Sequence, residues 1–327
     1  MDTDHRGLPK HVLHHDPALN LTYWGVGNGS PWTGDARPGD NLYTNSTLAL
    51  DADSGEIEAY HQYHWNGSWD WDEASAPLLI DLERGPQRVG ALVHPGRNGY
   101  LWVLERGPDS MRFMEGRPFV HQDVFAGVDP FSGRPAYDLA RVPGIGKRVQ
   151  FCPAAGGARN WWPEAFSPQT GLLYVSAANN LCSVMEGLAV EYEAGQPYFG
   201  AAAEEFMREG ADHVGELQAW DLDTGRRAWT QEFPVRGGSV LATAGELVFF
   251  DAVGDFMAFD ARSGEMLWEY SLNPTRPTGV ATSYAVGGVQ YVAVQFEARR
   301  AVRRLRNGSE RFPRGNLVVA FALDCQC

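Results

Sequence analysis

The sequence lacks several features that would place it in other protein classes. No stretch approaches about 18 consecutive apolar residues, so a transmembrane helix is not expected. The opening stretch, MDTDHRGLPKHVLHHD, contains no apolar segment of the kind found in secretory signals, so no signal is expected in it. Basic residues are in deficit, and a formal net charge of -14 argues against a nucleic-acid partner, whose phosphates require a basic face.

Cysteine is scarce, and its distribution excludes a zinc centre at the C-terminus. The four cysteines are Cys152, Cys182, Cys325 and Cys327. The last two, in DCQC, supply fewer ligands than a zinc site needs. An even number of cysteines is typical of an oxidising compartment, which conflicts with the absence of a signal in the opening stretch.

Glycine, proline and tryptophan are abundant, and one turn motif recurs. The 37 Gly, 20 Pro and 11 Trp favour many short strands joined by tight turns. The motif is an acidic or polar residue, two variable positions, Ser or Thr, and Gly. Such a turn is capped by the first side chain and closed by a residue that accepts a positive φ. Copies occur at 51–55, 129–133, 167–171, 221–225 and 260–264, with a relaxed copy at 16–20.

Alternating apolar runs flank these turns and predict β-hairpins. Two kinds of hairpin alternate, and the clearer units recur at about forty residues, the spacing of β-propeller blades. We therefore expect an all-β chain that forms a β-propeller of four to five blades; a small closed propeller or an open sandwich without a ligand remains an alternative. Residues 183–214 predict an inserted loop, and residues 297–315 an Arg-rich loop. The blades are expected at about 11–64, 76–140, 162–233, 238–273 and 279–324.

One acidic segment suggests a cation site. In WNGSWDWDEASAP, residues 65–77, Asp70 and Asp72 are two positions apart. In an extended strand they would point to the same face. Two like charges held that close repel unless a cation or a shared proton relieves them. The alternative is a pair of solvated carboxylates at the end of a strand.

Several stretches resemble the quinoprotein alcohol dehydrogenases, which use pyrroloquinoline quinone (PQQ). They keep the family order over about residues 10 to 295. The resemblance implies a β-propeller of the eight-bladed quinoprotein type, of which this chain matches the C-terminal four or five blades. Residues 1–327 would then form a single partial β-propeller domain, as a truncated or split form of a periplasmic protein. The stretches include YWGVGNGSPW, WDWDEASAP, VHPGRNGYLWVLER, FCPAAGGARNWWPEAF and RGGSVLATAGELVFF.

The resemblance also implies roles for individual residues. Asp70 would be the catalytic base and a neighbour of the metal ion, and Asn28 would coordinate that ion. Arg97 would lie beside the quinone carbonyls, and Asn160 and Trp161 would lie against the cofactor. Without the resemblance, Asn28 reads as a turn residue and Trp161 as a packing aromatic. A disulfide between Cys152 and Cys182 is implied as well.

The resemblance allows either calcium or a lanthanide as the metal ion. In lanthanide-dependent members an additional Asp stands two residues after the catalytic one, as Asp72 does here, whereas calcium-dependent members commonly lack it. Because a cation of higher charge is matched by a further anionic donor, a lanthanide is favoured. The chain departs from some members at Arg236, which stands where they have a Trp beneath the quinone.

The sequence thus predicts a PQQ- and metal-dependent alcohol dehydrogenase that passes hydride from a primary alcohol to the quinone, with Asp70 as the general base. The implied partners are a small alcohol, a cytochrome c electron acceptor, and an N-terminal half or a second copy that completes the propeller. The alternative is a non-catalytic propeller fragment used for binding or assembly.

Overall fold

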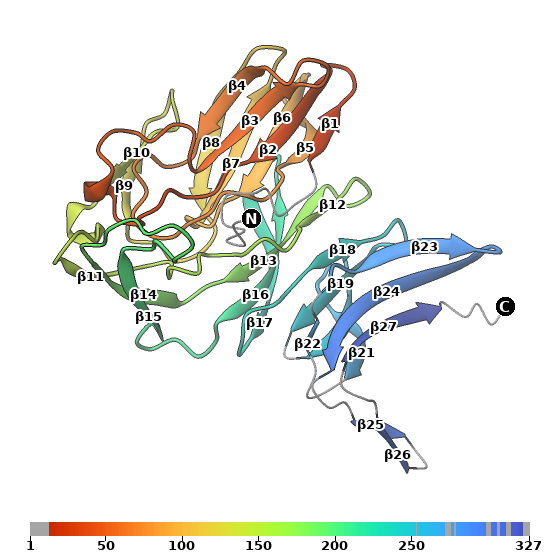
Figure 1. Cartoon of the computed structure of the whole chain (residues 1–327). Helices are drawn as coiled ribbons and strands as arrows, with labels where there is room; N and C mark the ends of the chain where they lie inside the picture. Colours follow the sequence, from red (N-terminus) through yellow and green to blue (C-terminus); the bar gives the residue numbers. More distant parts are fainter. Residues whose placement is uncertain are drawn as a thin grey trace. The chain divides into compact units, whose positions relative to one another are not determined.

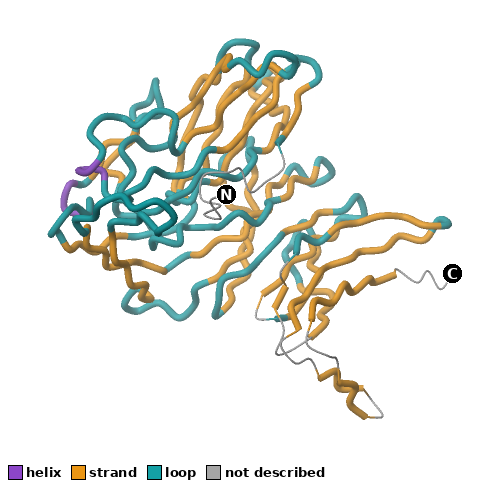
Figure 2. Tube along the Cα trace, viewed as in Figure 1, coloured by secondary structure: helices purple, strands orange, loops and turns teal. Residues whose placement is uncertain are grey.

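The computed structural model describes residues 13–252, 254–271, 276–277, 279–298, 302–305, 308–311 and 315–322. Within these ranges the chain is all-β apart from two short 3-10 turns, η1 (Gly34–Ala36) and η2 (Leu139–Arg141), as Figure 2 shows. This confirms the predicted fold class. No helix in the described part of the chain is long and apolar enough to span a membrane. Cys325 and Cys327 lie outside the described residues.

The chain divides into two compact units, and the first contains the predicted residues from Asn28 to Trp161. This unit extends to Trp161 and includes Asn179–Ala211. Two four-stranded antiparallel sheets form its larger part (Figure 1). Their strands are β1 (His14–Asp16), β2 (Leu21–Gly25), β3 (Ser46–Asp51) and β4 (Ile57–Gln62), then β5 (Leu78–Arg84), β6 (Gln87–Pro95), β7 (Tyr100–Arg106) and β8 (Met111–Pro118).

The remainder of the first unit differs from the expected inserted loop over 183–214. Two of its strands, β14 (Leu181–Gly187) and β15 (Ala201–Met207), join β11 (Arg148–Phe151) in a three-stranded sheet. Strand β15 is exposed along most of its length and has the sequence AAAEEFM. An exposed edge strand needs no apolar alternation, so its sequence resembles that of a loop. A separate ribbon is formed by β9 (Phe125–Val128) and β10 (Pro135–Tyr137).

The second unit comprises Trp162–Ala178 and the chain from Asp212 onward. It holds two four-stranded sheets in sequence order and a third sheet centred on β24. Strands β25 and β26 form a hairpin within the segment expected to be an Arg-rich loop. The strands are β12 (Ala165–Ser167), β13 (Leu172–Ala178), β16 (Gly215–Asp221), β17 (Arg226–Phe233), β18 (Val240–Ala242), β19 (Leu247–Ala252), β20 (Asp255–Asp260), β21 (Met266–Ser271), β22 (Arg276–Pro277), β23 (Thr282–Val286), β24 (Val289–Ala298), β25 (Val302–Leu305), β26 (Gly308–Arg311) and β27 (Gly315–Ala322).

The recurring turns close hairpins, as the sequence predicts. In the 51–55 copy, between β3 and β4, Asp51 Oδ1 accepts the main-chain N–H of Ser54 at 2.7 Å and Gly55 has φ 75°. The 260–264 copy, between β20 and β21, has the same arrangement: Asp260 Oδ1 accepts from the N–H of Ser263 at 2.8 Å. These contacts are local, so the motif alone predicts the turn.

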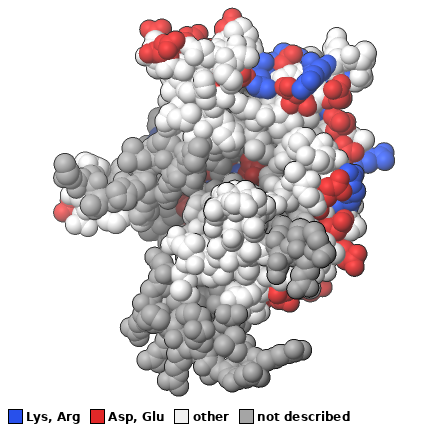
Figure 3. All heavy atoms as spheres, turned by 90° about the vertical axis from the view of Figure 1, so that its right-hand side faces the viewer, with Lys and Arg blue, Asp and Glu red and all other residues white. Residues whose placement is uncertain are grey.

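Aromatic side chains fill the core of the first unit, whereas aliphatic and phenylalanine side chains dominate the second. Buried aromatics of the first unit include Tyr23, Tyr63, Trp69, Trp71 and Trp102. Many charged side chains lie at the surface, and on the face that Figure 3 displays Lys and Arg lie next to Asp and Glu.

Candidate functional site

The loop that follows β2 is placed directly against the acidic segment. Val26 and Glu73 form an isolated antiparallel bridge. A Cβ atom at Gly25 would lie 2.5 Å from the main-chain oxygen of Glu73, so only glycine permits this approach. The close contact between the two backbones brings Asn28 to the acidic segment.

Asp70 lies in a strained part of this segment. The sequence interpretation of an extended strand is wrong here, because Asp70 has φ 63°, in the left-handed region, and lies in the connection between β4 and β5. Such a conformation costs on the order of 1 to 3 kcal/mol and is common at functional sites. The flanking Trp69 and Trp71 are buried and stacked with ring centroids 4.9 Å apart. The two indoles fix the segment on either side of Asp70.

Four of the predicted site residues form one contiguous cluster. Asn28 donates from Nδ2 to Asp70 Oδ1 at 3.1 Å and from its main-chain N–H to Asp72 Oδ1 at 3.0 Å. Arg97 donates from Nη1 to Asp72 Oδ2 at 2.9 Å, and its side chain is only 11% exposed. In this structure the repulsion between the two carboxylates is therefore relieved by donors from two other loops.

The loop at 154–158 packs against Arg97. The guanidinium donates from Nη2 to the oxygen of Gly156 at 3.2 Å, and the Arg97 main-chain oxygen accepts from Ala158 at 2.9 Å. Asn160 and Trp161 follow this loop, and Asn160 Oδ1 accepts the N–H of Trp161 at 2.8 Å. The hydrogen bonds that join Asn28, Asp70, Asp72 and Arg97 do not involve these two residues.

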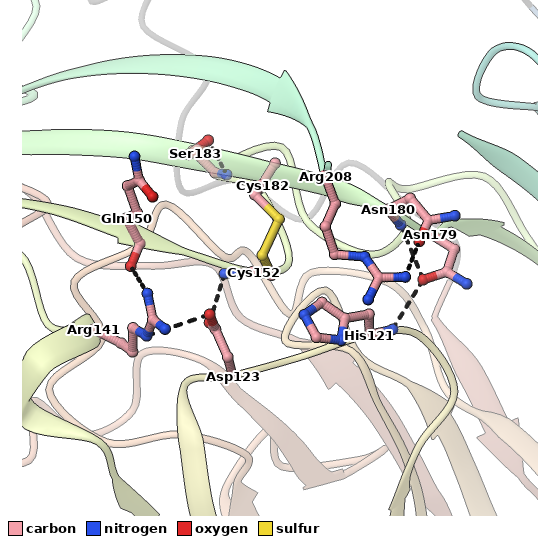
Figure 4. Close-up of a disulfide and its surroundings, with 12 residues drawn as sticks. His121, Asp123, Arg141, Gln150, Cys152, Asn179, Asn180, Cys182, Ser183 and Arg208 are labelled. Carbon is pink, nitrogen blue, oxygen red and sulfur yellow. Dashed lines mark hydrogen bonds and ion pairs between the residues drawn. A yellow bond between two sulfur atoms is a disulfide. The ribbon is translucent and has the colours of Figure 1, made fainter. Parts of the chain in front are cut away.

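A disulfide between Cys152 and Cys182 begins this loop, as the resemblance implied. It joins the residue after β11 to strand β14, and Figure 4 shows the polar contacts around it. Asp123 accepts the N–H of Cys152 at 2.8 Å and pairs with Arg141 at 3.3 Å. The loop is tied in turn to the acidic segment, because the Trp71 indole donates to the oxygen of Ala154 at 2.8 Å.

Sequence reasoning missed the role of Glu73, which it treated only as part of an acidic loop. The side chain is 1% exposed, and Oε2 accepts from His94 Nε2 at 2.8 Å and from the N–H of Arg97 at 3.0 Å. Burial by itself raises the pKa of a carboxyl, but here the hydrogen bonds from His94 and the Arg97 main chain outweigh it and lower the pKa of Glu73. Burial lowers the pKa of the neighbouring His64 to about 4, so that imidazole is neutral at pH 7.

The cluster fits part of the ligand shell of a hard cation. Asn28, Asp70 and Asp72 offer amide and carboxylate oxygens, the donors that calcium-like ions prefer. Such an ion takes about six to eight oxygens, so these three side chains would not complete its ligand shell. The paired Asp72 and Arg97 also place a cationic side chain next to the carboxylates, where oxygens of a bound acceptor could be hydrogen-bonded.

Two protein-family models match the chain in separate stretches. The model described as the β-propeller domain of glucose, ethanol and alcohol dehydrogenases matches residues 11–109, which include the cluster from Asn28 to Arg97. The model described as outer membrane protein assembly factor BamB matches residues 199–314.

Relatives of known identity match most of this chain but only part of their own length. Quinoprotein alcohol dehydrogenase PedH of Pseudomonas putida is 35% identical over 86% of this chain and 48% of its own. The lanthanide-dependent methanol dehydrogenase of Methylacidiphilum fumariolicum is 35% identical over 86% and 46%. Methanol dehydrogenase (cytochrome c) subunit 1 of Methylorubrum extorquens is 30% identical over 86% and 46%. The chain spans about half the length of these relatives.

Solved structures also match most of this chain over about half of their own length. A europium-containing methanol dehydrogenase superposes with a TM-score of 0.84 at 31% identity, over 88% of this chain and 51% of its own. The quinohemoprotein alcohol dehydrogenase from Comamonas testosteroni has a TM-score of 0.83 at 29% identity, over 97% and 48%. These matches confirm the predicted β-propeller fold of the quinoprotein type, and this chain covers about half of each solved structure.

Proposed function

Because this chain is related over most of its length to the quinoprotein alcohol and methanol dehydrogenases, we propose that it forms the part of a PQQ-dependent alcohol dehydrogenase that carries the catalytic carboxylate. The observation that supports this most strongly is the cluster of Asn28, Asp70, Asp72 and Arg97, which join through hydrogen bonds across three loops. Asn160 and Trp161 complete the proposed cofactor-binding set.

The contacts of Asp70, Asn28 and Arg97 support a catalytic role for each side chain. PQQ, when bound, supplies the hydride acceptor that no protein side chain can provide. Asp70 accepts the hydroxyl proton of a primary alcohol, and the donor at Asn28 Nδ2 orients its Oδ1. Arg97 donates hydrogen bonds to oxygens on which negative charge develops, and the shielded position of its guanidinium strengthens that interaction.

The metal ion would be held by oxygens of Asn28, Asp70 and Asp72, with the remaining ligands supplied from outside this cluster. The presence of two carboxylates favours a lanthanide over calcium. Relatives named as lanthanide-dependent, and one named as europium-containing, share this part of the chain and agree with that choice.

The proposed partners follow from the same relatives. A cytochrome c would accept the electrons, as the name of one relative indicates for that protein. A further polypeptide segment or a second copy would complete the propeller, and the proposed location is the periplasm. An assembly role is the second candidate, since the match at 199–314 is to a model for an assembly factor. That match lies outside the cluster from Asn28 to Arg97.

Reconstitution separates the two candidates. The full chain is incubated with PQQ and either lanthanum or calcium, and dye-linked oxidation of methanol and ethanol is followed. Alcohol-dependent dye reduction that requires both PQQ and a cation supports the dehydrogenase. A chain that neither binds PQQ nor oxidises either alcohol with either ion contradicts the proposal.

A further inference from the structure

The buried carboxylate of Glu73 binds two consecutive main-chain N–H groups of one loop. Oε2 accepts from Arg97 at 3.0 Å and Oε1 accepts from Asn98 at 3.3 Å. A third donor is His94 Nε2, at the end of β6 that leads into the same loop, 2.8 Å from Oε2, while His64 Nδ1 lies farther away, 3.6 Å from Oε1. Three donors from residues 94–98 therefore converge on a single side chain.

This arrangement couples the charge of Glu73 to the conformation of the loop at residues 94–98. An ionised carboxylate removed from water is stable only while its hydrogen bonds are made. Because the donors come from residues 94–98, a displacement of the loop would leave the charge unsatisfied. Asn98 reinforces the conformation, since its Oδ1 accepts from the N–H of Tyr100 at 3.0 Å and from Trp102 Nε1 at 3.2 Å.

Arg97 is consequently held at both ends by adjacent residues. Its main-chain N–H is bound by Glu73, and its guanidinium is bound by Asp72 at 2.9 Å. Asp72 and the oxygen of Gly156 restrain only the end of a long flexible side chain. The addition of a main-chain bond fixes the origin of that side chain and so the direction in which its remaining N–H groups point.

We propose that Glu73 is a positioning residue for Arg97, setting the direction of its guanidinium toward the quinone oxygens of the cofactor. This inference rests on the proposed function for the identity of the ligand, but the restraint on the loop is a property of the free chain. Glu73 is 1% exposed, so its proposed effect is exerted through Arg97.

Hydrogen exchange of the cofactor-free chain tests the restraint. Glu73→Gln retains the size of the side chain and removes its charge, so the amides of Arg97 and Asn98 should exchange about tenfold faster or more. Glu58→Gln, at an exposed position in β4, is the matched control and should leave these amides unchanged. Unchanged exchange of both amides in Glu73→Gln overturns the proposal.

A second variant, Glu73→Asp, tests the proposal even if Glu73→Gln does not fold. Glu73→Asp keeps the charge and withdraws it from the loop by one methylene, so the same two amides should exchange at an intermediate rate. If Glu73→Gln does not fold, wild-type exchange rates in Glu73→Asp overturn the proposal.

A double-mutant cycle on PQQ affinity tests whether Glu73 acts through Arg97. Fluorescence quenching with lanthanum present should show PQQ binding weakened about tenfold by Glu73→Gln. Once Arg97→Ala is present, adding Glu73→Gln should weaken binding no further. Fully additive losses contradict action through Arg97 and indicate general damage. If the wild-type chain binds no PQQ, the proposed function fails, whereas the exchange rates still decide the restraint.

Discussion

Glu73 in the first unit and Asp251 in the second are both buried, with exposed fractions of 1% and 4%. Their surroundings nevertheless shift the pKa of the carboxyl in opposite directions. Glu73 receives hydrogen bonds from a histidine and two main-chain N–H groups, and its pKa is lowered. Asp251 receives hydrogen bonds from the N–H and hydroxyl of Ser239, and burial raises its pKa to about 7.

The difference follows from the number and charge of the donors. A buried carboxylate is retained as an anion where several donors converge, and it tends to bind a proton where donors are few. The convergence occurs beside Asp70, Asp72 and Arg97, where the proposed chemistry needs fixed charges. At Asp251 the carboxyl packs against Gly238, and no such cluster adjoins it in the described contacts.

Equivalent substitutions in the two regions should have unequal effects on turnover, and this is the largest expected difference. Asp70→Asn removes the proposed base, so dye-linked alcohol oxidation should fall by about a hundredfold to ten-thousandfold. Asp251→Asn makes the same chemical change in the second unit and should leave the specific activity of folded protein near that of the wild type. Similar losses in both variants would contradict the assignment of Asp70.

The raised pKa of Asp251 predicts a stability that declines with pH. The unfolded chain releases the proton near the ordinary value of 3.8 and the folded chain near 7, so between these values the folded state holds more protons. Stability therefore falls as pH rises through this window, by roughly 4 kcal/mol at most, and is flat above it. Urea unfolding at pH 5 and pH 8 should show this decline, and Asp251→Asn should reduce it. An unchanged decline in Asp251→Asn would refute the prediction.

The disulfide should stabilise the first unit and leave the second largely unaffected. Cys152 and Cys182 are separated by 30 positions, and a cross-link over such a loop contributes about 3 to 4 kcal/mol in the chain-entropy model. Urea unfolding of Cys182→Ser should show that loss, and limited proteolysis should find new cleavage within 152–158. Cleavage that appears mainly in the second unit would contradict the expectation that the disulfide stabilises the first unit alone.

The smallest expected effect concerns the choice of metal ion. If Asp72 is the additional donor for a trivalent cation, Asp72→Ala should reduce lanthanum-supported alcohol oxidation about tenfold more than calcium-supported oxidation. The comparison uses the same preparation reconstituted with each ion. Equal losses with both ions would remove the basis for preferring a lanthanide.

Local chemistry explains why parts of this structure could be predicted from the sequence. The Asp-x-x-Ser-Gly turns make their own hydrogen bonds, so their hairpins and the blade spacing follow from the motif. The juxtaposition of Asn28, Asp70, Asp72 and Arg97 is not local, and only the family resemblance predicted it.

Features that depend on distant packing were not predictable from the sequence. The left-handed conformation of Asp70 depends on the two indoles that flank it and on the carbonyls to which they donate. The burial of Glu73 depends on the close approach of Gly25 to the main chain of Glu73. Neither contact leaves a periodic or spacing signal.

We propose above all that this chain carries a PQQ site built around Arg97 and its carboxylate neighbours. Equilibrium titration of the full chain with PQQ, with and without lanthanum, tests it most directly through the quenching of tryptophan fluorescence. We predict saturable binding that depends on the cation and is lost or severely weakened in Arg97→Ala. Binding that is absent in the wild type, or equally tight in Arg97→Ala, would contradict the claim.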